Sequence, residues 1–277
     1  MRYLFTKMQL FVCSLLIITL ILSCKKEVDD PYSSPEDYTR LVWSDEFDST
    51  SLSTARWNYQ VGPNWQNEEL QAYTNNPENI YVENGSLVIQ AKNEPITLSG
   101  VTKQYSSARI TTRNKGDWKY GKIEVRAKLP KGKGIWPAIW MMPTDDVYGG
   151  WPQSGEIDIM ELKGSAPYVT QGTIHYGPGP SSIHISDYFE LEKGDFSDDY
   201  HVFSILWEKD LIRWYVDGKM FFYVEPKTIA PEKYVFNERF HLILNCAVGG
   251  WFDGNPDETT QFPQKMYVDY VRVYQKP

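Results

Sequence analysis

The stretch SGEIDIMELKG, residues 154–164, decides the fold and the chemistry that this sequence predicts. Its three acids, Glu156, Asp158 and Glu161, lie inside an otherwise apolar run. On a regular strand the first two acids share a face and Glu161 lies on the opposite one. On a helix the first two acids point apart, and the apolar residues form no continuous stripe. Neither regular structure therefore brings the three acids together.

A strand with a one-residue bulge after Asp158 does bring them together. The extra residue shifts the alternation, so Glu161 rejoins the face of Glu156 and Asp158, while Ile157 and Ile159 point into the core. Two glutamate side chains that lean toward each other across roughly 13 Å of strand leave their carboxyls about 5–6 Å apart. That distance approaches the separation of about 5–5.5 Å in retaining glycosidases, where one carboxylate attacks the sugar and the other protonates the leaving oxygen.

The central acid has a role in the same scheme. The charge of Asp158 would keep the pKa of the acid high and would order the nucleophile. The alternative is a solvated face of an amphipathic strand. It is disfavoured, because three like charges on one face repel unless the protein uses them.

The rest of the chain predicts short β-strands joined by turns. Residues 81–92 contain Asn84-Gly85, a strong hairpin signal. Residues 201–224 contain three short strands separated by two turns, and residues 266–275 alternate apolar with polar side chains. Residues 177–199 predict a long loop that walls one end of the site. We therefore predict an all-β fold, a two-sheet antiparallel β-sandwich.

Composition excludes a nucleic-acid partner. The chain has 277 residues, a formal net charge of -8 and no basic stripe, so phosphate backbones would repel it. Aromatic residues make up 15% of the chain, which suits a protein that stacks aromatic faces on neutral sugar rings. For any single Trp, core packing is nevertheless the first expectation. The length suits one large all-β domain or two small ones.

The N-terminus predicts export and a lipid anchor. Residues 1–23 have a basic start, an apolar run and a final serine, which is the pattern of a signal peptide. Cys24 follows as in the lipobox of bacterial lipoproteins. We expect acyl chains on Cys24 to hold the protein on a bacterial membrane, facing the periplasm or the cell surface, without crossing it. Residues 24–39 predict a flexible tether, and residues 40–277 the folded domain.

Only one of the three cysteines falls in that domain. Cys13 leaves with the signal peptide and Cys24 is acylated, so we expect no intramolecular disulfide. Cys246 lies in HLILNCAVGG and predicts a small, buried, unreactive side chain.

The string GEIDIME, residues 155–161, resembles the bulged signature of glycoside hydrolase family 16, specifically of its laminarinase-like endo-β-1,3-glucanases. Nine segments over about residues 40–275 resemble their counterparts in that family, in the same order. They are LVWSDEFD, NEELQAYT, YSSARITT, YGKIEVRAKLP, GKGIWPAIWMMP, GGWPQSGEIDIMEL, GTIHYG, FHLILNCAVGG and MYVDYVRVY. The resemblance implies a concanavalin-like jelly roll with a concave substrate cleft. It also implies that Glu156 is the nucleophile, Glu161 the general acid/base and Asp158 the assisting carboxylate.

The resemblance implies aromatic and histidine contacts to the substrate as well. Trp136 and Trp140 would line the cleft if the residues between them face the core, and Trp151 lies just before the catalytic strand. His175 matches a histidine that contacts the acid/base in the family. We therefore expect its neutral imidazole to hydrogen-bond Glu161 or a sugar hydroxyl.

Further substrate contacts are expected from three loop or edge positions. Asn67 and Arg109 match polar sugar-contacting positions, although Glu68 stands where the family usually has a second Asn. Trp251 directly follows a double glycine, where relatives often have Asn-Trp, so we expect it to stack at a different subsite. The remaining histidines are expected to be structural; they are His184, His201 and His241.

Metal binding is expected only in a structural role. No Cys/His cluster has zinc spacing, so we expect no cofactor for catalysis. The resemblance implies a structural Ca²⁺ on the convex face, with Glu46, Gly85 and Asp269 at the ligand positions, since oxygen ligands suit that ion. The alternative is that both acids are plain surface residues.

These inferences predict a retaining endo-glycosidase that hydrolyses internal β-1,3 bonds of laminarin-type β-glucan. A mixed-linkage β-1,3-1,4-glucanase and a β-glucan transglycosylase are alternatives, because either could use the same two carboxylates. A non-catalytic glucan-binding surface protein is a third, but it would have no use for a paired acid and nucleophile. The expected partner is a β-glucan polysaccharide or oligosaccharide, with the chain acting as a monomer.

Overall fold

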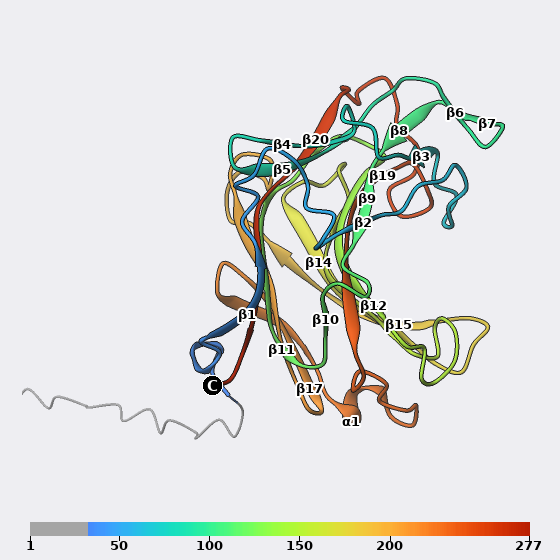
Figure 1. The fold of residues 1–277 in the computed structure, drawn as a ribbon. Coiled ribbons are helices and arrows are strands. Elements are labelled where there is room, and N and C mark those ends of the chain that lie inside the picture. The colour runs from blue at the N-terminus through green and yellow to red at the C-terminus, as the bar shows by residue number, and fades with distance from the viewer. Residues whose placement is uncertain (1–32) are drawn as a thin grey trace, which may run out of the picture. The chain divides into compact units, whose positions relative to one another are not determined.

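The computed structural model describes residues 33–277, in which two large antiparallel β-sheets pack face to face (Figure 1). The first sheet runs in the order β18 (Lys219–Val224), β17 (Leu211–Val216), β16 (His201–Glu208), β11 (Gly121–Lys128), β20 (Gln264–Gln275), β5 (Ser86–Ala91) and β4 (Ile80–Glu83), with β1 (Arg40–Asp45) beside β20. The second runs in the order β15 (Ile183–Glu190), β14 (Val169–Tyr176), β13 (Glu156–Leu162), β12 (Ile135–Pro143), β19 (Phe240–Val248), β9 (Arg109–Thr111) and β2 (Asn58–Tyr59), with β10 (Asp117–Trp118) beside β19. The predicted two-sheet antiparallel sandwich is confirmed.

Small elements complete the described residues. A short parallel pair joins β3 (Gln71–Tyr73) to β8 (Tyr105–Ser107), and a hairpin joins β6 (Ile96–Leu98) to β7 (Val101–Lys103). The helices are one 3-10 turn, η1 (Pro35–Asp37), and one α-helical turn, α1 (Pro226–Ile229). Within residues 33–277 no helix is long and apolar enough to span a membrane.

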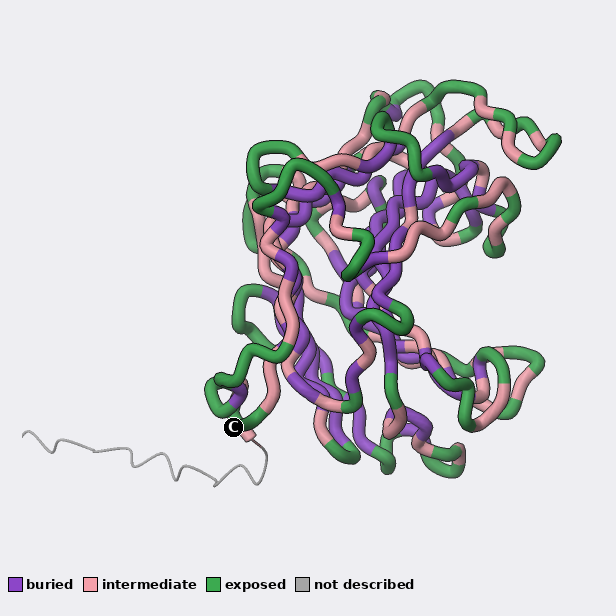
Figure 2. The backbone as a smooth tube through the Cα atoms, viewed as in Figure 1, coloured by how far each residue is buried: buried purple, intermediate pink, exposed green. Residues whose placement is uncertain are grey.

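The core lies between the two sheets (Figure 2). Strand β11 shows how the sequence builds it: buried and half-buried residues alternate along its whole length, so Ile123, Val125 and Ala127 point inward. Strand β19 is central in its sheet and is buried at every position. It carries Cys246, whose thiol is free and buried, as predicted. Burial raises the pKa of this thiol to about 12, so it stays protonated and unreactive.

The predicted turns are confirmed, and their residues have the positive φ angles that Asn, Asp and Gly adopt most readily. Asn84 and Gly85 join β4 to β5, and both have positive φ, 52° and 74°. That geometry is the one Asn-Gly hairpins supply. Asp210 joins β16 to β17 and Asp217-Gly218 joins β17 to β18, again with positive φ.

Two sequence-based boundaries are wrong. The folded unit begins at Ser34, because Tyr38 is buried against Leu206 and Tyr215 and its hydroxyl lies 3.2 Å from a carboxylate oxygen of Glu208. The end of the expected tether is therefore docked on the first sheet. The segment expected to be a long loop contains strand β15, which pairs with β14 over its full length. The predicted signal peptide and Cys24 lie outside the described residues.

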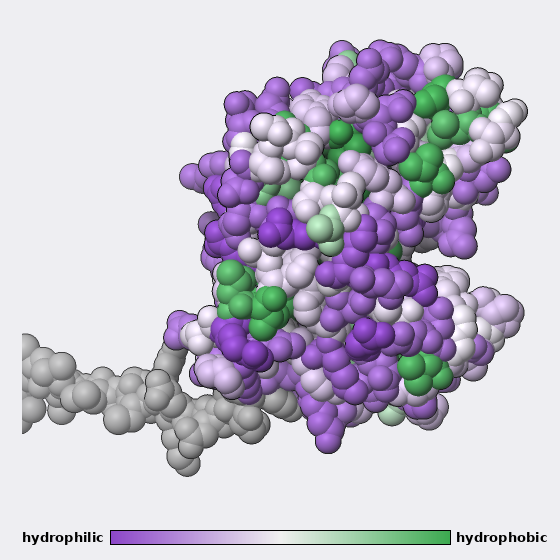
Figure 3. All heavy atoms as spheres, in the orientation of Figure 1, coloured by the Kyte–Doolittle hydropathy of each residue, from purple (hydrophilic) through white to green (hydrophobic). Residues whose placement is uncertain are grey.

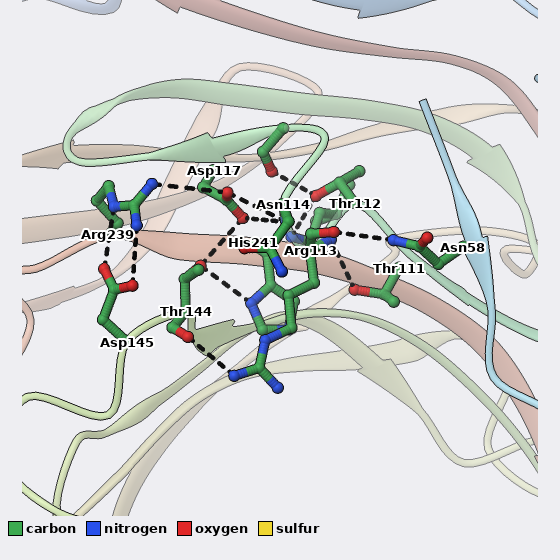
Figure 4. A network of polar contacts seen from close by, with 12 residues as sticks. Asn58, Thr111, Thr112, Arg113, Asn114, Asp117, Thr144, Asp145, Arg239 and His241 are labelled. Atoms are coloured by element: carbon green, nitrogen blue, oxygen red, sulfur yellow. Dashed lines mark hydrogen bonds and ion pairs between the residues drawn. The ribbon is translucent and has the colours of Figure 1, made fainter. Parts of the chain in front are cut away.

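A polar network beside β10 joins Asp117 to Thr144, which follows β12, and to His241 of β19 (Figure 4). Thr144 donates to Asp117 at 3.0 Å, and its hydroxyl lies 3.1 Å from Nδ1 of His241. Arg113 donates to the Thr144 carbonyl at 2.9 Å. His241 is buried, and burial together with neighbouring arginines lowers its pKa to about 4. His241 is thus a neutral structural residue, as expected from the sequence.

Candidate active site

The outer face of the second sheet carries a cleft with a cavity volume of about 1310 Å³. Its floor is formed by side chains of β9, β12, β13, β14, β15 and β19, and loops near residues 64–67, 151 and 251–252 form its rims. In the space-filling view the surface is indented at its right-hand edge (Figure 3). The cleft therefore crosses the strands, with β13 near its middle.

Strand β13 contains the predicted bulge. Asp158 pairs with Thr173 of β14 and Glu161 pairs with Gln171, so three steps on β13 face two on its neighbour. On the other side, the register with β12 passes from Asp158 directly to Met160, which makes Ile159 the extra residue. Glu156, Asp158 and Glu161 all line the cleft, while Ile159 is buried in the core. The bulge after Asp158 is confirmed, and the three acids share one face.

The core holds the bulge from behind. Trp214 of β17 donates its indole N–H to the carbonyl of Asp158 at 2.8 Å. Gly172 of β14 leaves the space for that ring, because a Cβ at this position would lie 2.5 Å from Trp214. The two sheets are therefore in contact directly beneath the three cleft acids.

Glu161 is held by two neutral donors. Nε1 of Trp136 donates to Oε1 at 3.0 Å, and Nε2 of Gln171 donates to Oε2 at 3.2 Å. Burial raises the pKa of Glu161, and these hydrogen bonds oppose the rise because they stabilise the carboxylate. A carboxyl whose pKa lies above its ordinary value can remain protonated near neutral pH, as a general acid must.

Glu156 and Asp158 form a coupled pair. Burial, then the charge of Glu161, raises the pKa of Glu156, while the indole N–H of Trp151 and the Asp158 side chain bond to it and oppose the rise. Asp158 is 2% exposed, and burial and both glutamates raise its pKa well above the ordinary value. The pKa of Glu156 rises to about 7 and that of Asp158 rises further, so Asp158 holds the proton of their shared hydrogen bond and donates it to Glu156.

His175 lies beside Glu156 and Asp158 and not beside Glu161, which was its predicted partner. The register places it opposite Glu156, with Nε2 3.4 Å from Oδ2 of Asp158. Burial, then the neighbouring His184, lowers the pKa of His175 to about 4, so the imidazole is neutral. The predicted hydrogen bond from His175 to Glu161 is wrong, because Gln171 occupies that register position.

Three predicted residues, Trp136, Trp140 and Arg109, contribute to the half of the cleft over β12, β19 and β9. Trp136 and Trp140 both line it, while Ile139 between them is fully buried. The guanidinium of Arg109 lies between two indoles, 4.6 Å from the ring centroid of Trp140 and 4.8 Å from that of Trp65. These rings and the fixed cation form a wall suited to a neutral, hydroxylated ligand.

Trp251 and Asn67 lie together at the rim. The backbone N–H of Trp251 donates to the Asn67 carbonyl at 3.1 Å, and both residues line the cleft. The Trp251 ring is 62% exposed and meets Trp136 edge-on, with 5.8 Å between centroids. Asp253 secures this loop by accepting hydrogen bonds from the backbone N–H groups of Gly134, at 2.8 Å, and of Ser165, at 3.1 Å.

Several cleft residues were not predicted. They include Trp65, Glu69, Gln171, Thr173, His184, Ser186, Tyr188, Asn245 and Phe252. The alternation of side chains along VTQGTIHY, residues 169–176, could have predicted two of them, because it puts Gln171 and Thr173 on the same face as His175. Its use required knowing which face of β14 is the outer one.

The structural Ca²⁺ expected at Glu46, Gly85 and Asp269 stays a prediction, and in this structure the two acidic side chains are paired with arginines. Both carboxylate oxygens of Glu46 accept hydrogen bonds from Arg272, at 3.0 and 2.7 Å. Asp269 accepts one from Arg126 at 2.6 Å. Among residues 33–277 the acids and histidine close enough to hold a metal are Glu156, Asp158 and His175, which line the cleft.

Residues 67–272 match the family described as glycosyl hydrolases family 16. The chain belongs to this family. It is 46% identical over 258 residues to glucan endo-1,3-beta-glucosidase A1 of Niallia circulans, a match that covers 85% of this chain but only 38% of that relative. It is 39% identical to a beta-glucanase of Rhodothermus marinus, covering 93% of this chain and 92% of the relative. The laminarinase catalytic domain from Thermotoga maritima superposes with a TM-score of 0.80 at 47% identity, covering 86% and 98% of the two chains. The chain is therefore a glycoside hydrolase, and its fold is the jelly roll of laminarinases.

Proposed function

We propose that this glycoside hydrolase cleaves internal β-1,3-glucosidic bonds of laminarin-type glucan and retains the anomeric configuration. One observation carries the proposal: the bulge at Ile159 puts Glu156 and Glu161 on the same face of one strand, in the middle of a cleft. Two carboxyls facing one sugar linkage are what double displacement requires. The names of the relatives support the β-1,3 linkage.

The residues divide the reaction between them. In the first step Glu161 gives its proton to the glycosidic oxygen, Glu156 attacks the anomeric carbon, and the bond to the leaving sugar breaks. The product is a glycosyl ester on Glu156. In the second step Glu161 takes a proton from water, the water oxygen attacks the same carbon, and the ester bond breaks. Asp158 keeps its proton throughout and donates a hydrogen bond to Glu156.

An internal cut is supported by the position of β13. Side chains line the cleft on both sides of that strand, from β12, β19 and β9 on one side and from β14 and β15 on the other. A glucan chain can therefore extend past the catalytic acids in both directions. Cleavage of mixed-linkage glucan is the second candidate, since one relative is named a beta-glucanase without restriction to β-1,3 bonds.

The N-terminal proposals rest on the sequence alone. We propose that the chain is exported and anchored through acylated Cys24, and that the domain acts as a monomer. Labelling of cells with a palmitate analogue tests the anchor, with Cys24→Ala as the variant that loses the label. Light scattering of the purified domain tests the monomer.

The catalytic assignment is tested by Glu156→Gln and Glu161→Gln. Each should lower kcat on laminarin more than a thousandfold, while Glu124→Gln, on the first sheet outside the cleft, should not change it. Equal melting temperatures exclude misfolding. Proton NMR of the first products should show the β-anomer. Early α-anomer, or normal turnover by either catalytic variant, would contradict the proposal.

A further inference from the structure

Three strongly exposed aromatic rings line the cleft. They are Trp151, 46% exposed, Tyr188, 59% exposed, and Trp251, 62% exposed. Trp151 donates to Glu156 and Trp251 contacts Trp136, so both belong to the site already described. Tyr188 has no such role. It lies on β15, the edge strand of the second sheet.

The register places Tyr188 beside the residue that holds the acid/base. Gln171 pairs with Tyr188, Thr173 with Ser186, and His175 with His184. All six side chains line the cleft, so they share the outer face of β14 and β15. The Thr173 and Ser186 hydroxyls lie 2.9 Å apart and are hydrogen-bonded. Gln171 donates to Glu161, so Tyr188 lies beside the residue that holds the proposed acid/base, and β14 separates the strand of Tyr188 from β13.

The spacing of strands gives the distance that matters for a sugar chain. Neighbouring strands lie about 4.8 Å apart, so β15 is roughly 10 Å from β13 across the sheet. A first sugar next to the scissile bond would lie over β14, above Thr173. The ring of Tyr188 would then lie under the sugar that follows.

The residues that line the two halves of the cleft differ in exposure, and this difference indicates which part of the sugar chain each half binds. Over β12, β19 and β9 the wall is buried and fixed: Trp136 is 7% exposed, Asn245 is 5% exposed, and Arg109 is clamped between indoles. Over β15 the wall is exposed. A retaining enzyme must hold the covalently bound sugar through both steps but must release the leaving sugar between them. The deep half suits the retained part of the chain, and the shallow half suits the part that leaves.

We propose that Tyr188 is a stacking platform for the second sugar on the leaving-group side, and for an acceptor sugar that replaces water in the second step. This inference rests on the proposed function. In transfer, Glu161 takes the proton of an acceptor hydroxyl, whose oxygen attacks the anomeric carbon as the ester bond to Glu156 breaks. A new glycosidic bond forms and Glu156 returns to its ionised state. The acceptor is a neutral β-glucan oligosaccharide, because the cleft is lined by the acids Glu156, Asp158 and Glu161, which would repel an anionic one.

The test compares a substrate that reaches Tyr188 with one that does not. Laminarin has sugars on both sides of the cut, whereas an aryl β-laminaribioside has a single leaving ring that ends above β14. Tyr188→Ala should lower the ratio of kcat/KM for laminarin to kcat/KM for the aryl glycoside about tenfold, equivalent to about 1.4 kcal/mol. Tyr188→Phe keeps the ring and should change the ratio less than twofold.

The matched control is Tyr223→Ala. Tyr223 is 50% exposed on β18, the edge strand of the other sheet, and does not line the cleft. It should leave the ratio unchanged. With laminaribiose added as acceptor, Tyr188→Ala should also lower the yield of transfer product relative to hydrolysis.

Three results would overturn the inference. Both kcat/KM values could be unchanged in Tyr188→Ala, which would mean that the ring contacts no substrate. Both substrates could lose activity equally, which would put Tyr188 on the retained side or in a structural role. Failure of the wild-type enzyme on both substrates would instead refute the proposed function, and this inference with it.

Discussion

Replacing His241 with asparagine should remove a pH-dependent loss of stability. His241 is 3% exposed and its Nδ1 lies 3.1 Å from the Thr144 hydroxyl. Asparagine places a polar atom at the same point but does not titrate. Burial, then Arg113 and Arg109, lowers the pKa of His241 to about 4, whereas an unfolded histidine has a pKa of about 6.5.

The sign follows from which state binds the proton. Between pH 6.5 and 4 the unfolded chain protonates at this position and the folded chain does not, so folded-state stability falls as the pH falls. A pKa difference of about 2.5 between the two states gives a loss of about 3 kcal/mol at pH 4 relative to pH 7.5. Other titrating groups act equally on both proteins. The difference in unfolding free energy, wild type minus His241→Asn, should therefore decrease by that amount.

Urea denaturation at pH 7.5 and pH 4, followed by tryptophan fluorescence, measures this difference. His201→Asn is the control, because His201 lies at the surface beside Asp217. A wild-type minus His241→Asn difference that stays the same at both pH values would refute the reasoning. It would mean that His241 is as easily protonated in the folded protein as in the unfolded one.

Three further variants test the site. Gln171→Leu removes a donor to the carboxylate of Glu161, so the pKa of Glu161 should rise. The alkaline limb of the kcat/KM profile on laminarin should therefore move to higher pH. The control is Gln90→Leu, outside the cleft, which should leave the profile unchanged. Asn245→Leu removes the acceptor of an indole hydrogen bond in the deep half of the cleft, and should raise KM for laminarin more than it lowers kcat. Asp253→Ala leaves two backbone N–H groups without their acceptor, and should lower the free energy of unfolding by about 2 kcal/mol in urea titrations. An unshifted pH profile, an unchanged KM or an unchanged urea midpoint would contradict the respective assignment.

The sequence was sufficient to predict the structure where a local backbone conformation depends on a few neighbouring residues. Three acids at positions 156, 158 and 161 share a face only if one residue bulges out, and the structure has that bulge. Asn84-Gly85 supplies two positive φ angles and therefore a hairpin. These inferences need no knowledge of distant parts of the chain.

The sequence was insufficient where the answer depends on which strands are neighbours. The partner of Glu161 is Gln171 and not His175, and that choice is made by the β13–β14 register. Arg272 binds Glu46 because β1 pairs with β20. The two strands are more than two hundred residues apart in the sequence, and no local pattern predicts that they pair. Strand β15 was missed because Gly, Pro and Ser precede it and because five of its eight residues are exposed.

The pairing of β1 with β20 has a practical consequence. Arg40 lies opposite Gln275 in the first sheet, and its guanidinium donates to the carbonyl of Lys276 at 3.3 Å, so the two ends of the folded domain leave together (Figure 1). The cleft belongs to the other sheet. The enzyme can therefore be immobilised on a bead, or fused to a second protein, through either terminus, and long glucan chains will still reach the catalytic groove.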